Sequence, residues 1–403
     1  MKKASKLIFL FLAVSGAIFF GCGTDQDHSQ GFQTVSDSGS GNSAHLSQGA
    51  VLIPASWQQV SAGGYHTCGI AIDKSLWCWG DNGYGELGDG TTAQRLYPNQ
   101  VDLALDWKSV SAGSYFSCAI KTNGTLWCWG DNQYCQLGLG NTTPYWIPQQ
   151  VGTAQNWSSV STGYVHACAK KSDGTLWCWG RGWDGQLGNG NNGSQCQPAK
   201  VNKATDWTSV YVGNYHSCGK KKNGNIYCWG NNSSGQIGDG TTTDKLHPTR
   251  IGSRENWKQV YAGSNHSCGL KKNGTLWCWG WNGFGQLGDG ATADKNIPAK
   301  IGADTDWTLV RHKGGFTCGR KSNGARWCWG INNVNQLGDG SVEEKHSPNQ
   351  ADSYTDWKTI EAGLLHGCGI KTDLSLWCWG VNTYGQVGDG TKNNAPAPLK
   401  ISP

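Results

Sequence analysis

One tryptophan recurs every fifty residues along this chain of 403 residues, seven times and without drift. Around each tryptophan the same motif returns, as in residues 257–290, WKQVYAGSNHSCGLKKNGTLWCWGWNGFGQLGDG. A fixed period of this length predicts a repeat architecture, in which each copy buries its apolar surface against its neighbours. Residues shared by all copies therefore build the repeat, and residues that vary carry more information about function. The recurring residues are Trp57, Trp107, Trp157, Trp207, Trp257, Trp307 and Trp357.

The first residues predict export. Three lysines precede an apolar run over residues 7–20, which is too short for a membrane-spanning helix. Because the run ends in a small residue followed by Cys22, we expect residues 1–21 to be a lipoprotein signal peptide and Cys22 to carry the lipid. Phe19 stands where such signals usually carry leucine, so a plain secretory signal is the alternative.

The remainder divides into a tether and one repeat domain. Residues 22–49 are rich in Ser, Gly, Gln and Asp and are expected to be a flexible tether, whereas residues 50–403 form the repeats. The chain has 33 basic and 28 acidic residues, and losing the three signal lysines leaves a net charge of +2. Such a charge lacks the basic excess of nucleic-acid-binding proteins. No other stretch is long and apolar enough to cross a bilayer, so we expect membrane contact through the lipid alone.

The cysteines predict disulfide bonds in an oxidising compartment. Fourteen of the 17 cysteines follow one rule, C-x9-C in every copy, a spacing wider than zinc sites use. With Cys22 set aside, only Cys135 and Cys196 remain, and they are expected to form an eighth pair. We therefore expect a protein of the periplasm, outer membrane or cell surface. The spaced pairs are Cys68 with Cys78, Cys118 with Cys128, Cys168 with Cys178, Cys218 with Cys228, Cys268 with Cys278, Cys318 with Cys328, and Cys368 with Cys378.

Each cysteine pair lies in a predicted β-hairpin. In the second copy an Asn-Gly separates two apolar runs, which is a strong hairpin signal. A three-residue loop over residues 122–124 places Cys118 directly opposite Cys128, with Cβ atoms about 4.5–5.5 Å apart. A two-residue loop would put the two cysteines on opposite faces. We choose the three-residue loop, which sends the cysteines to one face and Trp127 and Trp129 to the other.

Both faces of this hairpin are apolar, so the sheet must be covered on both sides. Stacking the tryptophan face of one copy on the cysteine face of the next around an axis gives a propeller. Residues 107–113 fit the innermost strand, and residues 98–101, with their proline, fit a short outer strand. We therefore predict an all-β, seven-bladed β-propeller of four-stranded blades, with residues 51–54 helping to close the ring. Lys74 and Leu374 replace the loop glycine in copies 1 and 7, where the hairpins should be the most strained.

The motif AGxxHxC…GTLWCWGxNxxGQLGDG resembles the regulator of chromosome condensation repeat, over about residues 51–401. Bacterial exported members with paired cysteines are the most similar. The resemblance implies a seven-bladed β-propeller and, for the eukaryotic member that names the family, nucleotide exchange on a nuclear GTPase while bound to chromatin. We do not extend that activity, because no insertion breaks the fifty-residue step and the signal removes the chain from cytosolic GTPases. An exported relative that inhibits beta-lactamases through loops on one face implies protein binding without catalysis.

A histidine opens the second strand in five copies, and phenylalanine replaces it in the other two. A ring of imidazoles suggests a metal site. Because phenylalanine substitutes twice, we expect instead that each side chain packs at the start of its hairpin and that the histidines bond a neighbouring backbone group. The positions are His66, Phe116, His166, His216, His266, Phe316 and His366.

Other recurring motifs are expected to shape turns. Residues 83–88 and 283–288 match G-x-G-x-x-G, but the strand and helix of a dinucleotide site do not flank them. The aspartates of the GDG turns supply too few oxygen ligands for calcium and are expected to bond their own turn backbone. They are Asp89, Asp239, Asp289, Asp339 and Asp389. We find no nucleophile, base and acid arrangement, and we predict no catalytic residue, metal or cofactor.

What varies between copies lies in two loops per copy, and there aromatic residues gather. Exposed tyrosine and tryptophan suit protein or sugar contact. Copy 6 departs most, with Arg311, His312 and Lys313 in place of the usual small SAG, and with Arg320 and Arg326 in addition. It is either a basic contact or a degenerate blade. The candidate binding residues are Tyr65, Tyr115, Tyr164, Tyr215, Trp183, Trp281, Phe284 and Arg311, and the same loops carry Tyr84, Tyr134 and Tyr384.

These observations favour a lipid-tethered, monomeric, non-enzymatic propeller that binds a protein partner through one loop face. A protein inhibitor of an exported enzyme is the first alternative. A carbohydrate-binding module is the second, although seven similar sites would then be expected and the aromatic positions differ between copies.

Overall fold

The structure is a computed structural model, and it describes residues 53–252 and 256–402. The predicted signal peptide and the tether with Cys22 lie outside these residues. The described residues belong to one compact unit. The described residues form 28 β-strands, and no helix among them is long and apolar enough to span a membrane.

The strands fall into four sets by their place in the repeat. The first strands are β1 (Trp57–Ala62), β5 (Trp107–Ala112), β9 (Trp157–Thr162), β13 (Trp207–Val212), β17 (Trp257–Ala262), β21 (Trp307–His312) and β25 (Trp357–Ala362). The second are β2 (His66–Ala71), β6 (Phe116–Lys121), β10 (His166–Lys171), β14 (His216–Lys221), β18 (His266–Lys271), β22 (Phe316–Lys321) and β26 (His366–Lys371). The third are β3 (Leu76–Gly80), β7 (Leu126–Gly130), β11 (Leu176–Gly180), β15 (Ile226–Gly230), β19 (Leu276–Gly280), β23 (Arg326–Gly330) and β27 (Leu376–Gly380). The fourth are β4 (Arg95–Gln100), β8 (Tyr145–Gln150), β12 (Gln195–Lys200), β16 (Lys245–Arg250), β20 (Lys295–Ile301), β24 (Lys345–Gln350) and β28 (Ala395–Ile401).

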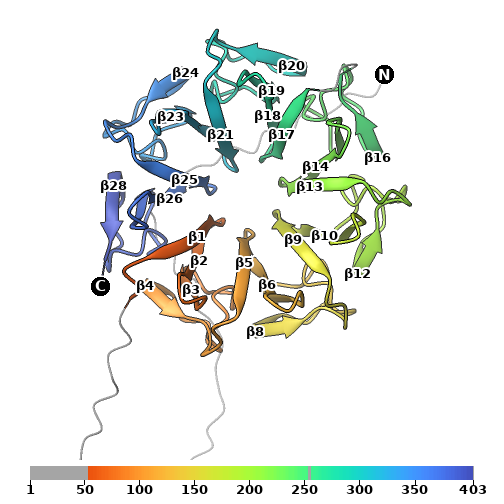
Figure 1. The fold of residues 1–403 in the computed structure, drawn as a ribbon, viewed down its shortest axis with the longest axis vertical. Coiled ribbons are helices and arrows are strands. Elements are labelled where there is room, and N and C mark those ends of the chain that lie inside the picture. The colour runs from red at the N-terminus through yellow and green to blue at the C-terminus, as the bar shows by residue number, and fades with distance from the viewer. Residues whose placement is uncertain (1–52, 253–255, 403) are drawn as a thin grey trace, which may run out of the picture. The chain divides into compact units, whose positions relative to one another are not determined.

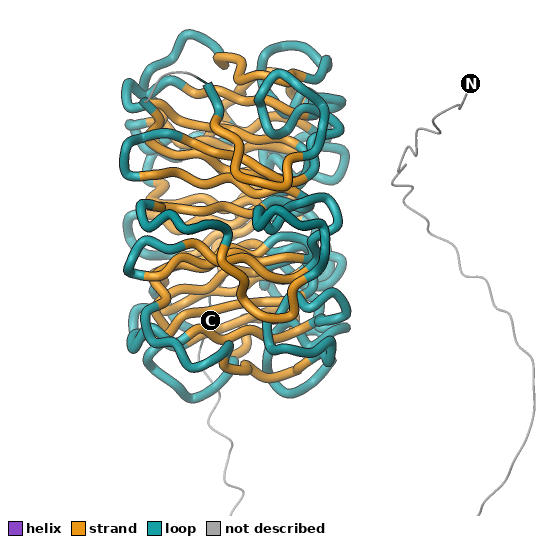
Figure 2. Tube along the Cα trace, turned by 90° about the vertical axis from the view of Figure 1, so that its right-hand side faces the viewer, coloured by secondary structure: helices purple, strands orange, loops and turns teal. Residues whose placement is uncertain are grey.

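Each copy folds into one antiparallel sheet whose strand order follows the chain, as in β1-β2-β3-β4. Seven such blades surround an axis, with the first strand of each nearest the centre (Figure 1). Seen from the side, the strands lie between two layers of loops (Figure 2). The predicted seven-bladed β-propeller of four-stranded blades is confirmed.

The ring closes by packing blade 1 against blade 7. β28 is the outer strand of its own copy, and Ile53 and Pro54 belong to no strand. Ile53 packs instead against the cluster that contains Trp57 and Ile401. Residues 51–52 of the predicted closing segment lie outside the described residues. The part of that segment that is described therefore contributes through side-chain packing rather than as a strand.

The hairpin register is the one that a three-residue loop predicts. Cys118 pairs with Cys128 and Ile120 with Leu126, and Gly124 has φ +80°. Lys74 and Leu374 occupy the same loop position with φ 69° each. Since a side chain in the left-handed region costs about 1–2 kcal/mol, copies 1 and 7 carry the expected backbone strain there.

The core consists of seven similar interfaces between blades. At the first of them, Cys68 and Cys78 on one blade pack against Trp107 and Trp129 on the next. The indole of Trp129 also donates a hydrogen bond to the Glu86 carbonyl of the preceding blade, at 2.9 Å. All seven equivalent tryptophans make this bond, at 2.9–3.1 Å. Apolar burial and a repeated hydrogen bond thus join each blade to its neighbour.

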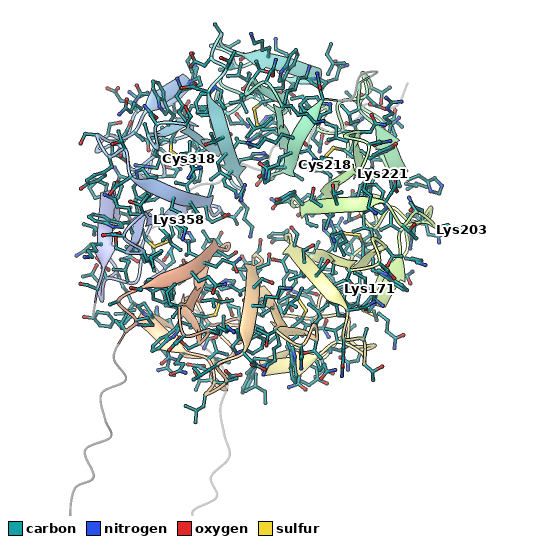
Figure 3. The ribbon with its side chains drawn as sticks, viewed as in Figure 1. Lys171, Lys203, Cys218, Lys221, Cys318 and Lys358 are labelled. Atoms are coloured by element: carbon teal, nitrogen blue, oxygen red, sulfur yellow. A yellow bond between two sulfur atoms is a disulfide. The ribbon has the colours of Figure 1, made fainter. Side chains whose placement is uncertain are left out.

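Eight disulfide bonds reinforce the ring. Seven join the second and third strands within a blade, and Figure 3 marks Cys218 and Cys318 in this position. The eighth joins Cys135 to Cys196 and so links copies 2 and 3. The structure thus forms the pairs that the spacing predicts. The seven bonds within blades are Cys68 to Cys78, Cys118 to Cys128, Cys168 to Cys178, Cys218 to Cys228, Cys268 to Cys278, Cys318 to Cys328, and Cys368 to Cys378.

Candidate binding surfaces

Two loops of every blade meet on one face of the ring. The turn after the first strand lies beside the segment after the third strand, because His66 pairs with Gly80 and the Asp81 N–H donates to the Tyr65 carbonyl at 3.0 Å. The variable positions that the sequence singles out therefore come together at one end of the blades. Eight aromatic side chains from these loops gather there, and we call them the aromatic arc: Tyr65, Tyr84, Tyr115, Tyr134, Tyr164, Trp183, Tyr215 and Tyr384.

The arc runs over blades 7, 1, 2, 3 and 4, and five of its tyrosines form an unbroken row of ring contacts. Ring centroids lie 5.6 Å apart for Tyr384 and Tyr65, and 5.7 Å apart for Tyr65 and Tyr115. The row continues from Tyr115 to Tyr164 at 5.9 Å and from Tyr164 to Tyr215 at 5.8 Å. These separations are those of favourable aromatic pairs. Neighbouring rings therefore hold one another in place across the blade boundaries.

The outer members of the arc are the most accessible. Tyr84 lies 5.3 Å from Tyr115 and is 45% exposed, and Tyr384 is 39% exposed. Trp183 is 58% exposed and packs edge-on against Tyr134, with ring centroids 5.7 Å apart. These three rings therefore offer the most accessible aromatic surface of the arc.

Arg181 lies on the same face and contacts two rings of the arc. The guanidinium of Arg181 lies 4.3 Å from the Trp183 ring centroid and 5.0 Å from that of Tyr215. It also forms an ion pair with Asp184, at 3.3 Å. Cation–π contacts of this kind restrict the indole, so Trp183 is an exposed but oriented side chain.

Three of the candidate residues lie apart from the arc. Trp281 and Phe284 form a separate pair on blade 5, with ring centroids 5.1 Å apart. Arg311 lines a cavity that the inner strands form on the ring axis, where its Nε lies 2.8 Å from Glu361 and its guanidinium 4.5 Å from the Tyr261 ring centroid. The five other candidates come together in the arc, but Arg311 belongs to a different site.

The histidines are buried links between blades. Each donates from Nε2 to a Ser or Thr hydroxyl of the next blade, as His216 does to Ser267 at 2.8 Å. That hydroxyl in turn donates to the Gln236 carbonyl at 2.8 Å, so only the imidazole is left to donate to it. Burial lowers the pKa of all five histidines to about 3. The expected packing role is therefore correct, whereas the expected backbone partner is wrong.

The sequence holds a signal for this pairing. Histidine always faces a hydroxyl residue 51 positions later, whereas Phe116 faces Ala167 and Phe316 faces Gly367. For His366 the partner is Thr67, across the point where the ring closes. The two positions therefore exchange together, as expected for side chains in contact.

The remaining recurring motifs form turns. The Asp89 carboxylate accepts hydrogen bonds from the Thr91 N–H at 3.0 Å and the Thr91 hydroxyl at 2.7 Å. Gly85 and Gly88 adopt φ 78° and 76°, which explains the G-x-G-x-x-G match. Both motifs therefore serve the backbone, as predicted.

One cluster has the residue types of a metal site. His266 and His312 lie with ring centroids 4.3 Å apart, and ligand atoms of these residues and of Cys268 lie within 4.8 Å of one another. The Cys268 sulfur is bonded to Cys278, so it is not a thiolate. The cluster thus offers two imidazoles, fewer than the three or four ligands of zinc sites.

The basic residues of copy 6 do not form one patch. Arg326 takes the place of an apolar residue between blades 6 and 7, where it is fully buried, pairs with Asp352 at 2.7 Å and donates to the Leu337 carbonyl at 2.8 Å. Arg320 donates to the Trp357 carbonyl at 3.0 Å. Two acidic residues were missed by the sequence analysis: Glu361, which pairs with Arg311, and Glu86, which stands where the other six copies have glutamine. Burial raises the pKa of the Glu86 carboxyl to about 8.

Solved structures show the same fold. A structure described as Kap60 bound to yeast RCC1 (Prp20) matches with a TM-score of 0.74 and 18% identity, covering 92% of this chain and 91% of that chain. Prp20p from Saccharomyces cerevisiae, described with its binding to Gsp1p and histones, gives 0.74 and 19% identity over 87% and 88%. Human WBSCR16 gives 0.73 and 19% over 82% and 94%. No curated protein matches the chain in sequence.

Two family models, both described as the regulator of chromosome condensation (RCC1) repeat, match most of the propeller. The first matches residues 57–86, 107–136, 157–186, 207–236, 257–286 and 357–386. The second matches residues 73–120, 123–169, 173–219, 223–270, 273–322 and 375–403. The repeated motif, the seven blades and these matches lead to one conclusion: the chain belongs to the regulator of chromosome condensation (RCC1) repeat family.

Proposed function

We propose that this protein is a non-enzymatic, exported propeller that binds a protein partner through the aromatic arc. The observation that carries the proposal is the continuity of the arc: six tyrosines from five blades are linked ring to ring, and Arg181 joins the Tyr134–Trp183 pair to them. Tyrosine and tryptophan supply large contact areas at low entropic cost, and they dominate the energetics of protein interfaces. Rings that already contact one another lose little further freedom when a partner binds.

The asymmetry of the arc favours one protein partner over several sugars. A carbohydrate-binding module with seven equivalent blades would repeat its contact residues. The arc instead ends at Tyr215 on blade 4, because blade 5 has Asn265 and blade 6 has Gly315 at that position. A single extended surface fits one large partner better than seven small ones. The structural neighbours whose descriptions mention Kap60, Gsp1p or histones lend support through the fold alone, because their identity to this chain is below 20%.

Export of the protein rests on the cysteines. Eight disulfide pairs fit an oxidising, extracellular environment. Together with the apolar N-terminal run, they support our proposal that residues 1–21 are removed and that Cys22 anchors the propeller to the cell envelope. An exported partner then follows, and inhibition of an exported enzyme is a special case of the same binding mode.

The proposal is tested by affinity capture with the disulfide-bonded propeller from cell-envelope extract. The variant Tyr115→Ala/Trp183→Ala removes the middle of the arc and its most exposed ring. The control Tyr97→Ala removes a ring that is 55% exposed on the outer strand β4. We expect the arc variant to lose a partner that both the wild type and the control retain. Equal recovery of all bound proteins by the three would refute binding through the arc.

A further inference from the structure

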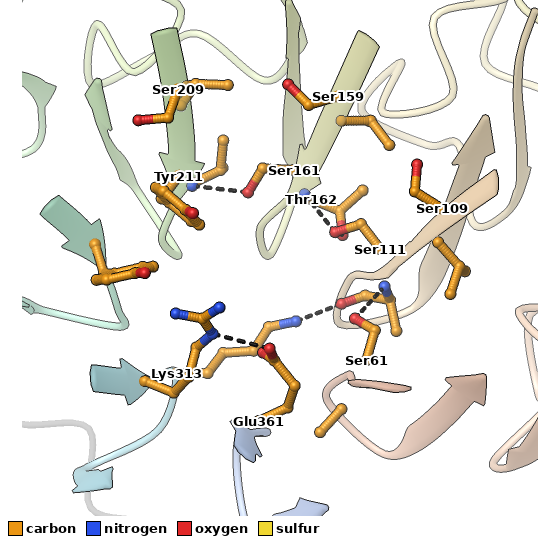
Figure 4. Close-up of a pocket in the computed structure, with 18 of the residues that line it drawn as sticks. Ser61, Ser109, Ser111, Ser159, Ser161, Thr162, Ser209, Tyr211, Lys313 and Glu361 are labelled. Carbon is orange, nitrogen blue, oxygen red and sulfur yellow. Dashed lines mark hydrogen bonds and ion pairs between the residues drawn. The ribbon is translucent and has the colours of Figure 1, made fainter. Parts of the chain in front are cut away.

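The inner strands enclose a polar cavity of about 440 Å³ on the ring axis. Its wall alternates between buried valines and small hydroxyl residues that face the axis, as Figure 4 shows for Ser61, Ser111 and Ser161. The volume lies within the range of small-molecule sites. The wall is almost entirely neutral, and its charged residues come from blades 6 and 7.

Blade 6 places a lysine where the other six blades have glycine. At Gly63 an added Cβ would lie 2.6 Å from the Gly113 carbonyl of the next blade, so a side chain does not fit there. Lys313 instead extends across the channel, and its Nζ donates to the Ala112 carbonyl of blade 2 at 2.5 Å (Figure 4). Blade 2 stands three blades away around the ring, so this single side chain spans the axis.

Lys313 is a buried cation that forms no ion pair with a carboxylate of the described residues. The Arg311 guanidinium is paired with Glu361 at 2.8 Å, which leaves the Lys313 ammonium as the net positive charge of the cavity. The residue is only 9% exposed, and its ammonium donates to a neutral carbonyl. Burial lowers its pKa to about 7. An ammonium has three donors, so two remain for an anion.

The hydroxyls of the wall offer further donors. The Ser61 oxygen accepts from the Ala112 N–H at 3.0 Å and the Ser161 oxygen from the Val212 N–H at 3.0 Å, which leaves each hydroxyl hydrogen for the channel.

We propose that the axial cavity binds a small organic monocarboxylate that carries hydroxyl groups, a hydroxy acid or sugar acid. Its carboxylate accepts a hydrogen bond from Lys313 Nζ, and its hydroxyls exchange hydrogen bonds with the serine hydroxyls of the cavity wall. One net positive charge matches one carboxylate, while a neutral polyol leaves the ammonium unpaired. The site is separate from the aromatic arc, so each proposal stands or fails without the other.

The test is isothermal titration of the disulfide-bonded propeller with sodium gluconate, sorbitol and inorganic phosphate at pH 6 and pH 9. Lys313→Gln removes the cation, and Lys345→Gln on the outer strand β24 is the matched control. We expect gluconate to bind the wild type with a Kd below about 1 mM. Binding should weaken at least about tenfold in Lys313→Gln and stay unchanged in Lys345→Gln. Sorbitol and phosphate should bind more weakly than gluconate.

The wild type alone gives a second readout, which does not depend on how the variant folds. Among the groups around Lys313, the buried His66 and His366 have pKa values of about 3 and stay neutral at both pH values, and Glu361 stays paired with Arg311. Loss of the lysine proton should therefore weaken gluconate binding at pH 9. The proposal is overturned if gluconate does not saturate the wild type, if sorbitol or phosphate binds as tightly, or if neither pH 9 nor Lys313→Gln weakens binding.

Discussion

We expect the buried histidine–hydroxyl pairs to lower the stability of the ring in acid. The chain itself shows how one pair can be replaced, since phenylalanine and alanine take these two positions between blades 2 and 3. The double variant His216→Phe/Ser267→Ala gives the junction of blades 4 and 5 the residues that blades 2 and 3 carry at Phe116 and Ala167. At pH 7 we expect little change in stability, because both hydrogen-bonding partners leave together. The Gln236 carbonyl keeps the Trp279 indole as its donor, at 3.0 Å.

The effect appears as the pH falls. Burial lowers the pKa of His216 to about 3 from an ordinary value of 6.5, so between these values the unfolded chain binds one proton more than the folded chain. Stability that is present above pH 6.5 is therefore lost as the pH falls toward 3. At pH 4.5 this histidine alone costs the wild type about 2.7 kcal/mol, at about 1.36 kcal/mol for each pH unit below 6.5. The double variant escapes that loss.

Urea unfolding at pH 7 and pH 4.5, with the disulfides intact, measures the difference. The double variant should gain about 2–3 kcal/mol relative to the wild type between the two pH values. Ser267→Ala alone keeps the histidine and should follow the wild type in its pH dependence. If the double variant loses as much stability in acid as the wild type does, the histidine is not the buried neutral base described above.

Three further changes test other parts of the structure by the same unfolding assay. Glu86→Gln installs the residue of the other six copies. Burial raises the pKa of Glu86 to about 8 from 4.5, so at pH 7 the unfolded chain has lost a proton that the folded chain keeps. The variant should therefore be more stable than the wild type by up to about 3 kcal/mol at pH 7, and by little at pH 4. Lys74→Gly should stabilise by about 1 kcal/mol, since φ is 69° there, whereas Gly274→Lys should destabilise because its Cβ would collide with a backbone carbonyl. Replacing Cys135 and Cys196 by serine should cost about 4 kcal/mol, given their separation of 61 residues. The account is contradicted if Glu86→Gln does not raise the stability at pH 7, or if Lys74→Gly lowers the stability. It is also contradicted if the serine variant of Cys135 and Cys196 leaves the urea midpoint unchanged.

The blades could be predicted from the sequence because their information is local and repeated. Cys118 and Cys128 lie ten residues apart, and only one loop length puts them opposite each other. Seven copies of that constraint fix the register and the stacking of tryptophan faces on cysteine faces. The histidine partners could also have been predicted from the sequence. Where Phe116 replaces the histidine, Ala167 replaces the hydroxyl residue, so the two positions change together.

The aromatic arc and the axial cavity, to which we assign binding only as proposals, were harder to predict because they depend on how the ring closes. Lys313 meets Ala112 across 201 residues, and no pattern within one copy indicates that contact. The arc joins Tyr384 to Tyr65 only because blade 7 packs on blade 1. Sequence alone marked the aromatic positions but could not order them in space, and it grouped Arg311 with them although that side chain turns into the channel.

Footprinting of the captured complex with hydroxyl radicals tests protein binding through the aromatic arc most directly. Oxidation rates of individual aromatic side chains are measured in the free propeller and in the complex. Trp183, Tyr84 and Tyr384 should be protected by the partner, while Tyr97 on the outer strand and Trp281 beyond the end of the arc keep the rates of the free protein. Protection of Tyr97 with unchanged oxidation of Trp183 and Tyr84 would place the partner elsewhere on the ring and contradict the account.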